Sequence, residues 1–311
     1  MAELHSRPNS EPNSSRSRTS EPLLDEEFLA RIEKLSLLSR ATLTGRIRGT
    51  RLSRRRGFST EFADHRDYVP GDDIRYLDWN IFGRLDRLFI KLFEEQEDLT
   101  VCLLVDCSKS MAHGTPDKFR YARQVAAALA YIALGTEDRV SVYPFDDALR
   151  APFKPVRGRR NALRLISWLA DLEAGSGTGL LPALTAFTGA APTRGVVILI
   201  SDLLDPSGYT DALRVLSGRR IDVHLIHVLS PQEIDPVLAG DLKLVDCEDG
   251  GAVEVTMSRS LLRSYRRTVE EFRAGVRESC SRLAITPLFT STGTPFDELI
   301  LRYLRSRKLV G

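Results

Sequence analysis

The chain has 311 residues, of which 42% are hydrophobic and 28% charged, and its formal net charge is +2 at pH 7. This length is enough for one large domain or two smaller ones, and the apolar content is enough for a substantial core. Because positive and negative charges nearly cancel, the molecule as a whole has no strong attraction to nucleic acid or anionic membranes, and we expect no nucleic-acid partner.

Residues 1–22 are rich in Ser, Arg, Asn, Pro and Glu and contain almost no large apolar side chains. Such a segment cannot bury enough surface to offset its chain entropy, so we predict a disordered tail. The tail also lacks the apolar stretch of a secretory signal. The longest apolar run, from Val125 to Leu134, is about half as long as the roughly 20 residues of a membrane-spanning helix.

The four cysteines are Cys102, Cys107, Cys247 and Cys280, and none of them forms a Cys-x-x-Cys pair. We expect buried, reduced thiols rather than a zinc site or a disulfide framework. Together with the absence of a predicted membrane span, this composition predicts a cytoplasmic protein.

Residues 23–98 are predicted to form an N-terminal segment that packs on the domain that follows. Phe28, Ile32, Leu35 and Leu38 recur at helical spacing and predict a short amphipathic helix between residues 24 and 39. Six arginines and no acids then occupy residues 46–56. A solvated loop is the ordinary interpretation of this Arg-rich run, and contact with phosphates or an acidic partner is the alternative.

The second half of this segment holds the block from Glu61 to Trp79, in which Pro70-Gly71 predicts a turn. Its acids alternate with arginines, which favours an ion-pair network that ties the segment to the following domain over a second metal site of the nuclease type. We expect Trp79, like Trp168, to anchor the core, and we expect a strand over residues 88–93. The candidate interaction residues of the block are Arg66, Asp72, Asp73, Arg75, Asp78 and Trp79.

From residue 99 to 311, predicted strands and helices alternate. This pattern implies right-handed crossovers and a parallel sheet covered by helices on both faces, which is an α/β, Rossmannoid architecture. The expected strands are Thr100–Asp106, Arg139–Phe145, Val196–Ser201, Val223–Leu229 and Ala284–Thr290. The expected helices are Thr115–Leu134, with Thr115 as N-cap and Pro116 first, then Leu180–Thr188, Asp211–Ser217 and Ser260–Leu283. A hairpin is expected over Lys243–Val255, turning at Asp249-Gly250-Gly251.

Polar side chains follow two of these strands. Asp106, Ser108 and Ser110 form an Asp-x-Ser-x-Ser pattern directly after the first strand; Thr178 lies in the Gly-rich loop before residue 180, and Asp202 follows the strand that starts at Val196. Ligands of open α/β sheets bind beyond the carboxyl ends of strands. If the two strands are neighbours, these oxygens meet at one edge and suit Mg²⁺, or Mn²⁺, which accepts the same ligand set. The alternative is that Ser108 or Ser110 merely caps the next helix.

Asp106-x-Ser108-x-Ser110, a Thr in a Gly-rich loop and an Asp after an apolar strand together resemble the metal-ion-dependent adhesion site of von Willebrand factor type A domains. The upstream block, Arg66-x-Tyr68-x-Pro70-Gly71-Asp72-Asp73-x-Arg75-x-x-Asp78-Trp79, is similar to that of the bacterial domain-of-unknown-function family numbered fifty-eight. That family joins such a block to a type A-like domain, and the resemblance covers about residues 24–306.

The resemblance implies that Ser108, Ser110 and Thr178 offer hydroxyl oxygens to the metal, while Asp106 and Asp202 act directly or through bound water. An ion with few direct carboxylates remains electron-poor, and an Asp or Glu of a protein partner can complete its shell. The implied function is a non-enzymatic, metal-dependent protein–protein interaction module.

Members of the family are often encoded beside MoxR-type AAA+ ATPases, which makes such an ATPase the expected partner and this chain its adaptor. The alternative function is a metal-dependent hydrolase of phosphodiesters, which would use the Asp106 site or the acids between Pro70 and Asp78.

Overall fold

The computed structural model of the chain describes residues 26–35, 61–70, 72–94, 99–175, 177–190, 192, 195–218, 221–236, 240–245 and 251–306. The predicted tail at 1–22, the Arg-rich run at 46–56, Cys247, and Asp249 and Gly250 of the predicted hairpin turn lie outside these residues. Cys102, Cys107 and Cys280 are buried and free, as expected.

The centre of the molecule is a six-stranded sheet with the strand order β10-β7-β6-β3-β4-β5. Neighbouring strands run parallel, except that β5 pairs antiparallel with β4 at one edge. The predicted α/β class with a mostly parallel sheet is therefore confirmed. The strands are β3 (Thr100–Asp106), β4 (Arg139–Phe145), β5 (Phe153–Arg157), β6 (Val196–Ser201), β7 (Asp222–Leu229) and β10 (Thr286–Ser291).

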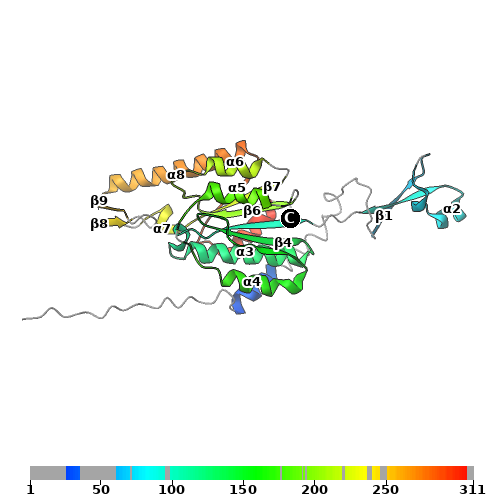
Figure 1. Cartoon of the computed structure of the whole chain (residues 1–311), viewed down its shortest axis with the longest axis horizontal. Coiled ribbons are helices and arrows are strands. Elements are labelled where there is room, and N and C mark those ends of the chain that lie inside the picture. The colour runs from blue at the N-terminus through cyan, green and yellow to red at the C-terminus, as the bar shows by residue number, and fades with distance from the viewer. Residues whose placement is uncertain are drawn as a thin grey trace, which may run out of the picture.

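Helices cover both faces of the sheet (Figure 1). On one face lie α3 (Lys118–Gly135), α4 (Ala162–Ala170), α9 (Phe296–Ser306) and the helix at residues 26–35. On the other face lie α5 (Leu180–Ala190), α6 (Thr210–Ser217) and α8 (Arg259–Arg282). The short elements around the sheet are η3 (Ser110–Ala112), η4 (Arg159–Asn161), α7 (Pro231–Ile234) and the antiparallel hairpin of β8 (Gly240–Val245) and β9 (Ala252–Met257).

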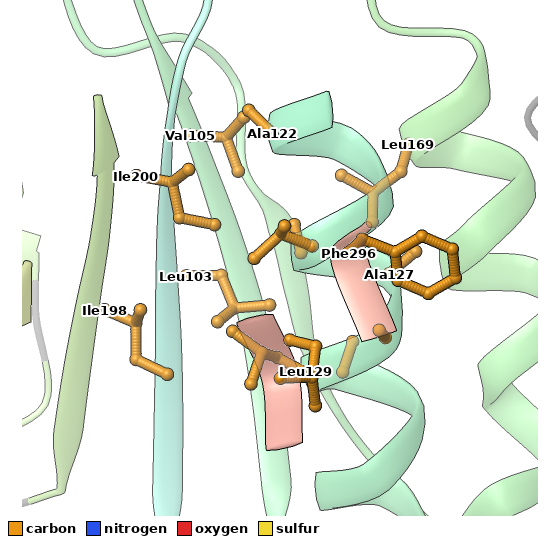
Figure 2. Close-up of a cluster of buried hydrophobic side chains, with 14 of the residues drawn as sticks. Leu103, Val105, Ala122, Ala127, Leu129, Leu169, Ile198, Ile200 and Phe296 are labelled. Atoms are coloured by element: carbon orange, nitrogen blue, oxygen red, sulfur yellow. The ribbon is translucent and has the colours of Figure 1, made fainter. Parts of the chain in front are cut away.

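Burial on both faces explains why the central strands are continuous apolar runs. Successive side chains of a strand point to opposite faces, so Leu103 and Val105 of β3 pack under α3 while Cys102 and Leu104 pack under α5 and α6. Figure 2 shows Leu103 and its neighbour Ile198 of β6 on the side of the sheet that α3 covers.

The first helix of the domain starts later than predicted. Thr115 and Pro116 precede α3 and are joined by a cis peptide bond, and the N-cap is Asp117, whose side chain accepts a hydrogen bond from the Arg120 N–H. The prediction that Thr115 caps this helix is therefore wrong. A later start places Lys118 at the first helical position, and this position proves important for the site.

The predicted amphipathic helix is present at residues 26–35, and its apolar face packs on the domain. Phe28, Ile32 and Leu35 are buried in the same core cluster as Phe296 of α9. The ring of Phe28 lies 5.0 Å from that of Phe296, and Arg31 pairs with Asp297. The helix at residues 26–35 thus packs on the sheet domain.

Residues 61–94 form a small unit of their own. Strand β1 (Glu61–Asp67) pairs antiparallel with β2 (Phe89–Glu94), and between them lie η2 (Ile74–Tyr76) and α2 (Trp79–Leu85). Residues 95–98, which join this unit to the sheet domain in the chain, are not described. The packing of the unit on the domain stays a prediction.

The expected core role of Trp79 is wrong, because 65% of this residue is exposed. Among the residues of the small unit whose burial is described, only Leu77 and Ile90 are buried apolar residues, which leaves little to cover an indole ring. Trp168, by contrast, is partly buried against the main core, and its ring lies 5.3 Å from that of Phe153. Within the described part of the chain, no helix has the length and apolar character needed to cross a bilayer.

Candidate functional site

Asp106, Ser108 and Ser110 lie together in the tight turn that follows β3. The side chain of Asp106 accepts a 2.9 Å hydrogen bond from the backbone N–H of Ser108. The two serine hydroxyl oxygens lie 3.1 Å apart. All three residues are buried, with exposed fractions of 2%, 0% and 7%. The turn therefore gathers one carboxylate and two hydroxyls at the carboxyl end of the strand.

Asp202 reaches the same edge from the neighbouring strand. β3 and β6 pair in parallel with Val105 opposite Ile200, so Asp106 stands opposite Ser201, and Asp202 follows at once. Asp202 is 1% exposed, and one of its carboxylate oxygens accepts a 3.0 Å hydrogen bond from the Leu204 N–H. The structure thus brings Asp106 and Asp202 to one edge, as adjacent strands require.

The loop that carries Thr178 is held beside the Asp106 turn through its backbone. The N–H of Gly175 donates to the carbonyl of Cys107 over 2.5 Å, and the N–H of Gly179 donates to the carbonyl of Asp146 over 2.9 Å. A Cβ at Gly179 would collide with the backbone carbonyl of Asp147, so this position requires glycine. Thr178 itself is partly exposed. Its loop borders the cluster, whereas a direct approach of its hydroxyl to the serines stays a prediction. We call Asp106, Ser108, Ser110, Thr178 and Asp202 the oxygen cluster.

The interpretation of Ser108 and Ser110 as helix caps is wrong for the helix that follows. Asp117 caps α3, and η3, which starts at Ser110, has no side-chain capping bond. The two hydroxyls are therefore available for another role at the end of the strand.

Burial and the nearby negative charge of Asp202 make Asp106 costly to ionise. Burial, followed by the negative charge of Asp202, raises the pKa of Asp106 to about 7, although hydrogen bonds from Ser108 and Ser201 partly offset the rise. A positive charge at this edge would relieve the repulsion. The hydroxyl and carboxylate oxygens are ligands that Mg²⁺ and Mn²⁺ accept, so the residues present fit such an ion. Among the described residues, no three His, Cys, Asp or Glu side chains lie close enough together to hold a metal ion by themselves.

A buried lysine, which the sequence analysis did not single out, places a positive charge beside the acids of the site. Lys118, the first residue of α3, is 0% exposed, and its ammonium group donates to Asp202 Oδ2 over 2.7 Å and to Glu233 of α7. Burial lowers the pKa of Lys118, but the two carboxylates outweigh this effect and hold it above its ordinary value. The ammonium therefore stays charged inside the protein.

Two further supports of the site were not predicted. Ser201 donates to Asp106, and the Arg150 guanidinium donates to Asp146 and, over 2.7 Å, to the carbonyl of Glu173 in the Thr178 loop. Small polar residues and surface-type charges are common at strand ends and helix starts, so their spacing alone gives no signal. Only the proximity of β3, β4 and β6 reveals them.

The candidate interaction residues of the small unit are engaged with one another. Arg66 pairs with Asp72 at 2.6 Å, and Arg75 pairs with Asp73 at 2.7 Å. A third acid, Asp78, caps α2 and lies 2.9 Å from His65 Nε2. These pairs lie within the block itself, and a network that ties the segment to the sheet domain stays a prediction. Among the described residues, none of the three acids belongs to a group of three metal-ligating side chains.

Comparison with known proteins gives a family and distant structural neighbours. Residues 64–275 match the family described as "Protein of unknown function DUF58". The chain is 28% identical to "Uncharacterized protein Rv1480" of Mycobacterium tuberculosis over 289 residues, 91% of each chain. Among solved structures it is similar to the conserved hypothetical protein BatB from Bacteroides thetaiotaomicron, at 13% identity and a TM-score of 0.44, over 68% of this chain and 98% of that one. It is also similar to proximal thread matrix protein 1 of the mussel byssus with a zinc-occupied MIDAS motif, at 14% identity and a TM-score of 0.38, over 68% and 47% of the two chains.

Proposed function

We propose that this chain, which belongs to the family described as Protein of unknown function DUF58, is an interaction module that binds a protein partner through a divalent cation at the oxygen cluster. The observation that carries the proposal is the convergence of two buried serine hydroxyls, 3.1 Å apart, with the buried carboxylates of Asp106 and Asp202. The proposed ion is Mg²⁺ or Mn²⁺.

The arrangement of the hydrogen bonds suggests which residues would hold the ion. Ser108, Ser110 and Thr178 would supply neutral hydroxyl oxygens. Both oxygens of Asp106 and both oxygens of Asp202 already accept hydrogen bonds from the protein, which favours a role for these acids through their charge or through bound water. When bound, such an ion would supply a positive charge that can accept a carboxylate oxygen from a partner.

The chain's own residues would then orient the partner. The carboxylate of Asp106 is held by hydrogen bonds from its own turn and from the neighbouring strand, and the exposed Lys109 lies within the same turn. A cation beside a metal site attracts an acidic partner and favours fast association. We therefore propose a partner that presents an Asp or Glu.

The partner we propose is an AAA+ ATPase of the MoxR type, with this chain as its adaptor in the cytoplasm. The choice of an ATPase as partner rests on the resemblance to the family. The cytoplasmic location rests on the buried free thiols, which suit a reducing compartment.

The experiment is affinity capture with the full chain as bait, in Mg²⁺ and again with chelator, followed by identification of the bound proteins. We expect the ATPase in the Mg²⁺ eluate alone, and its loss with Asp106→Ala. Asp211→Ala is the matched control, because that acid is exposed and paired only within α6. Capture that is unaffected by chelator and by Asp106→Ala would overturn the proposal.

The same preparations test for enzymatic activity. We expect no turnover of a phosphodiester substrate such as bis(p-nitrophenyl) phosphate. Turnover that requires Mg²⁺ and disappears in the Asp106→Ala protein would favour the hydrolase instead.

A further inference from the structure

Lys118 is unusual because its charge is enclosed within the protein. It is 0% exposed and is among the largest fully buried side chains of the described residues. Burying a charge is costly unless it is paired and hydrogen-bonded. Its partners come from two other elements: Asp202 after β6 and Glu233 in α7. The first position of a helix does not require a buried lysine. We therefore looked for the role of Lys118 in its contacts with the acids of the site.

The ammonium of Lys118 fixes Asp202 in one orientation. It donates to Oδ2 of that carboxylate over 2.7 Å, while the Leu204 N–H donates to Oδ1 over 3.0 Å. Asp202 can therefore act on an ion in the oxygen cluster mainly through its charge, and Lys118 reduces that charge.

Glu233 has the opposite effect, since it offsets part of the charge of Lys118. One of its carboxylate oxygens contacts Lys118, and the other accepts a 2.7 Å hydrogen bond from the Ser230 N–H in a capping box at the start of α7. Its side chain is 27% exposed, so it is the one member of this network that borders solvent.

The charges of the network suit a divalent ion. When all are ionised, the carboxylates of Asp106, Asp202 and Glu233 contribute three negative charges and Lys118 contributes one positive charge, which leaves two negative charges in excess. A divalent cation makes this group neutral. Without Lys118 the excess would be three, and without Glu233 it would be one.

We infer that Lys118 is a built-in counter-cation that sets the affinity of the oxygen cluster for divalent ions, and that Glu233 opposes it. This inference rests on the proposed function, because it presupposes that the cluster binds a cation. Lys118 is a positioning residue: it acts on the ion through Asp202 and through charge.

The inference gives opposite signs for two substitutions. Lys118→Met removes a positive charge and keeps the length of the side chain, so the affinity for the divalent ion should rise by roughly tenfold or more. Glu233→Gln removes a negative charge and retains a residue type that suits a capping box, so the affinity should fall by roughly tenfold. Lys118→Met combined with Glu233→Gln restores the wild-type charge, and its affinity should return to within about threefold of the wild-type value.

The test is calorimetric titration of Mg²⁺, and separately Mn²⁺, into the full chain of each variant, with circular dichroism to confirm folding. Glu271→Gln is the matched control, because this acid pairs with Arg267 on the exposed side of α8. A purely structural role of Lys118 would weaken or abolish binding in Lys118→Met and would not produce a gain.

Lys118→Met can also destabilise the fold, because it leaves two carboxylates without their cation. In that case the Glu233→Gln variant provides the test. Unchanged or tighter binding of the divalent ion by this variant overturns the inference, and weaker binding supports it. If the wild-type chain binds neither ion, the proposed function itself fails. If the wild-type chain binds and neither charge change moves the affinity as stated, only the inference about Lys118 fails.

Discussion

The hydroxyl of Ser201 donates a 2.5 Å hydrogen bond to Oδ2 of Asp106, across two neighbouring strands of the parallel sheet. The other oxygen of the same carboxylate accepts from the Ser108 N–H. Asp106 is thereby fixed both by its own turn and by the next strand. Because Ser201 is fully buried, this bond forms where water cannot replace it.

Replacement of Ser201 by alanine should therefore cost stability out of proportion to the size of the change. The substitution leaves a buried carboxylate oxygen with one partner fewer, and we expect the free energy of unfolding to fall by about 1–3 kcal/mol. Urea denaturation measures the loss. Ser207→Ala, at an exposed position of the following turn, should change stability by less than about 0.5 kcal/mol. Equal values for the two variants would contradict the role given to Ser201.

Ser110→Ala tests the hydroxyl pair itself. Removal of one hydroxyl takes away one proposed oxygen ligand but only one 3.1 Å contact, to Ser108. We expect Mg²⁺ affinity measured by calorimetry to fall by roughly tenfold or more, while the free energy of unfolding without metal falls by no more than about 1.5 kcal/mol. Thr185→Ala, at an exposed position of α5, is the control. An unchanged Mg²⁺ affinity would remove Ser110 from the ligand set.

The sheet and the location of the oxygen cluster could be predicted because strands that are buried on both faces appear in the sequence as continuous apolar runs. β3 and β6 are continuous apolar runs, and their polar ends mark the carboxyl edge. β5 was not predicted, because it is an edge strand with a lysine, a proline and an arginine, and its side chains are partly or fully exposed. Short edge strands of this kind resemble loops in sequence.

Lys118 could not be predicted for a different reason. A lysine in the first turn of an amphipathic helix ordinarily points to solvent, and only the three-dimensional convergence of α3, the end of β6 and α7 encloses it. The residues of the oxygen cluster could be selected as proposed ligands from their types and spacing. The charged residues around them could not, because their types and positions are common on protein surfaces.

The pair of Arg31 and Asp297 gives a prediction for pH. Burial raises the pKa of Asp297, but the hydrogen bond and charge of Arg31 outweigh it and hold the pKa below its ordinary value. A depressed carboxyl pKa contributes stability above the unfolded-state value of about 3.9, and this contribution is lost as the pH falls through the folded value. We expect Arg31→Met to lower the melting temperature at about pH 6 and to have a smaller effect at about pH 2.

Thermal unfolding of both proteins at the two pH values measures this difference. Met retains the packing of the side chain against Phe296, over which the Arg31 guanidinium lies at 4.6 Å. Arg267→Met, which breaks an exposed pair within α8, is the control and should have little effect at either pH. A gap between wild type and Arg31→Met that is as large at low pH as at high pH would contradict the role of the ion pair.

The small unit at residues 61–94 exposes an unusual share of large apolar side chains. Val69, Ile74, Trp79 and Leu85 are each more than half exposed. Two arginines of the unit are paired within it, Arg66 with Asp72 and Arg75 with Asp73. An exposed indole in a group of exposed apolar side chains is typical of a residue that contributes strongly to binding.

We therefore expect Trp79→Ala to separate binding from stability. The ring meets Phe82 edge to face at 6.2 Å, so the free energy of unfolding should fall by no more than about 1.5 kcal/mol. Capture of the partner in Mg²⁺ should weaken by roughly tenfold or more, as for a central interface residue. Leu163→Ala, at a 62% exposed position of α4, is the matched control and should leave capture unchanged. If Trp79→Ala captures the partner as well as wild type does, this unit takes no part in the interaction, and recognition rests on the oxygen cluster alone.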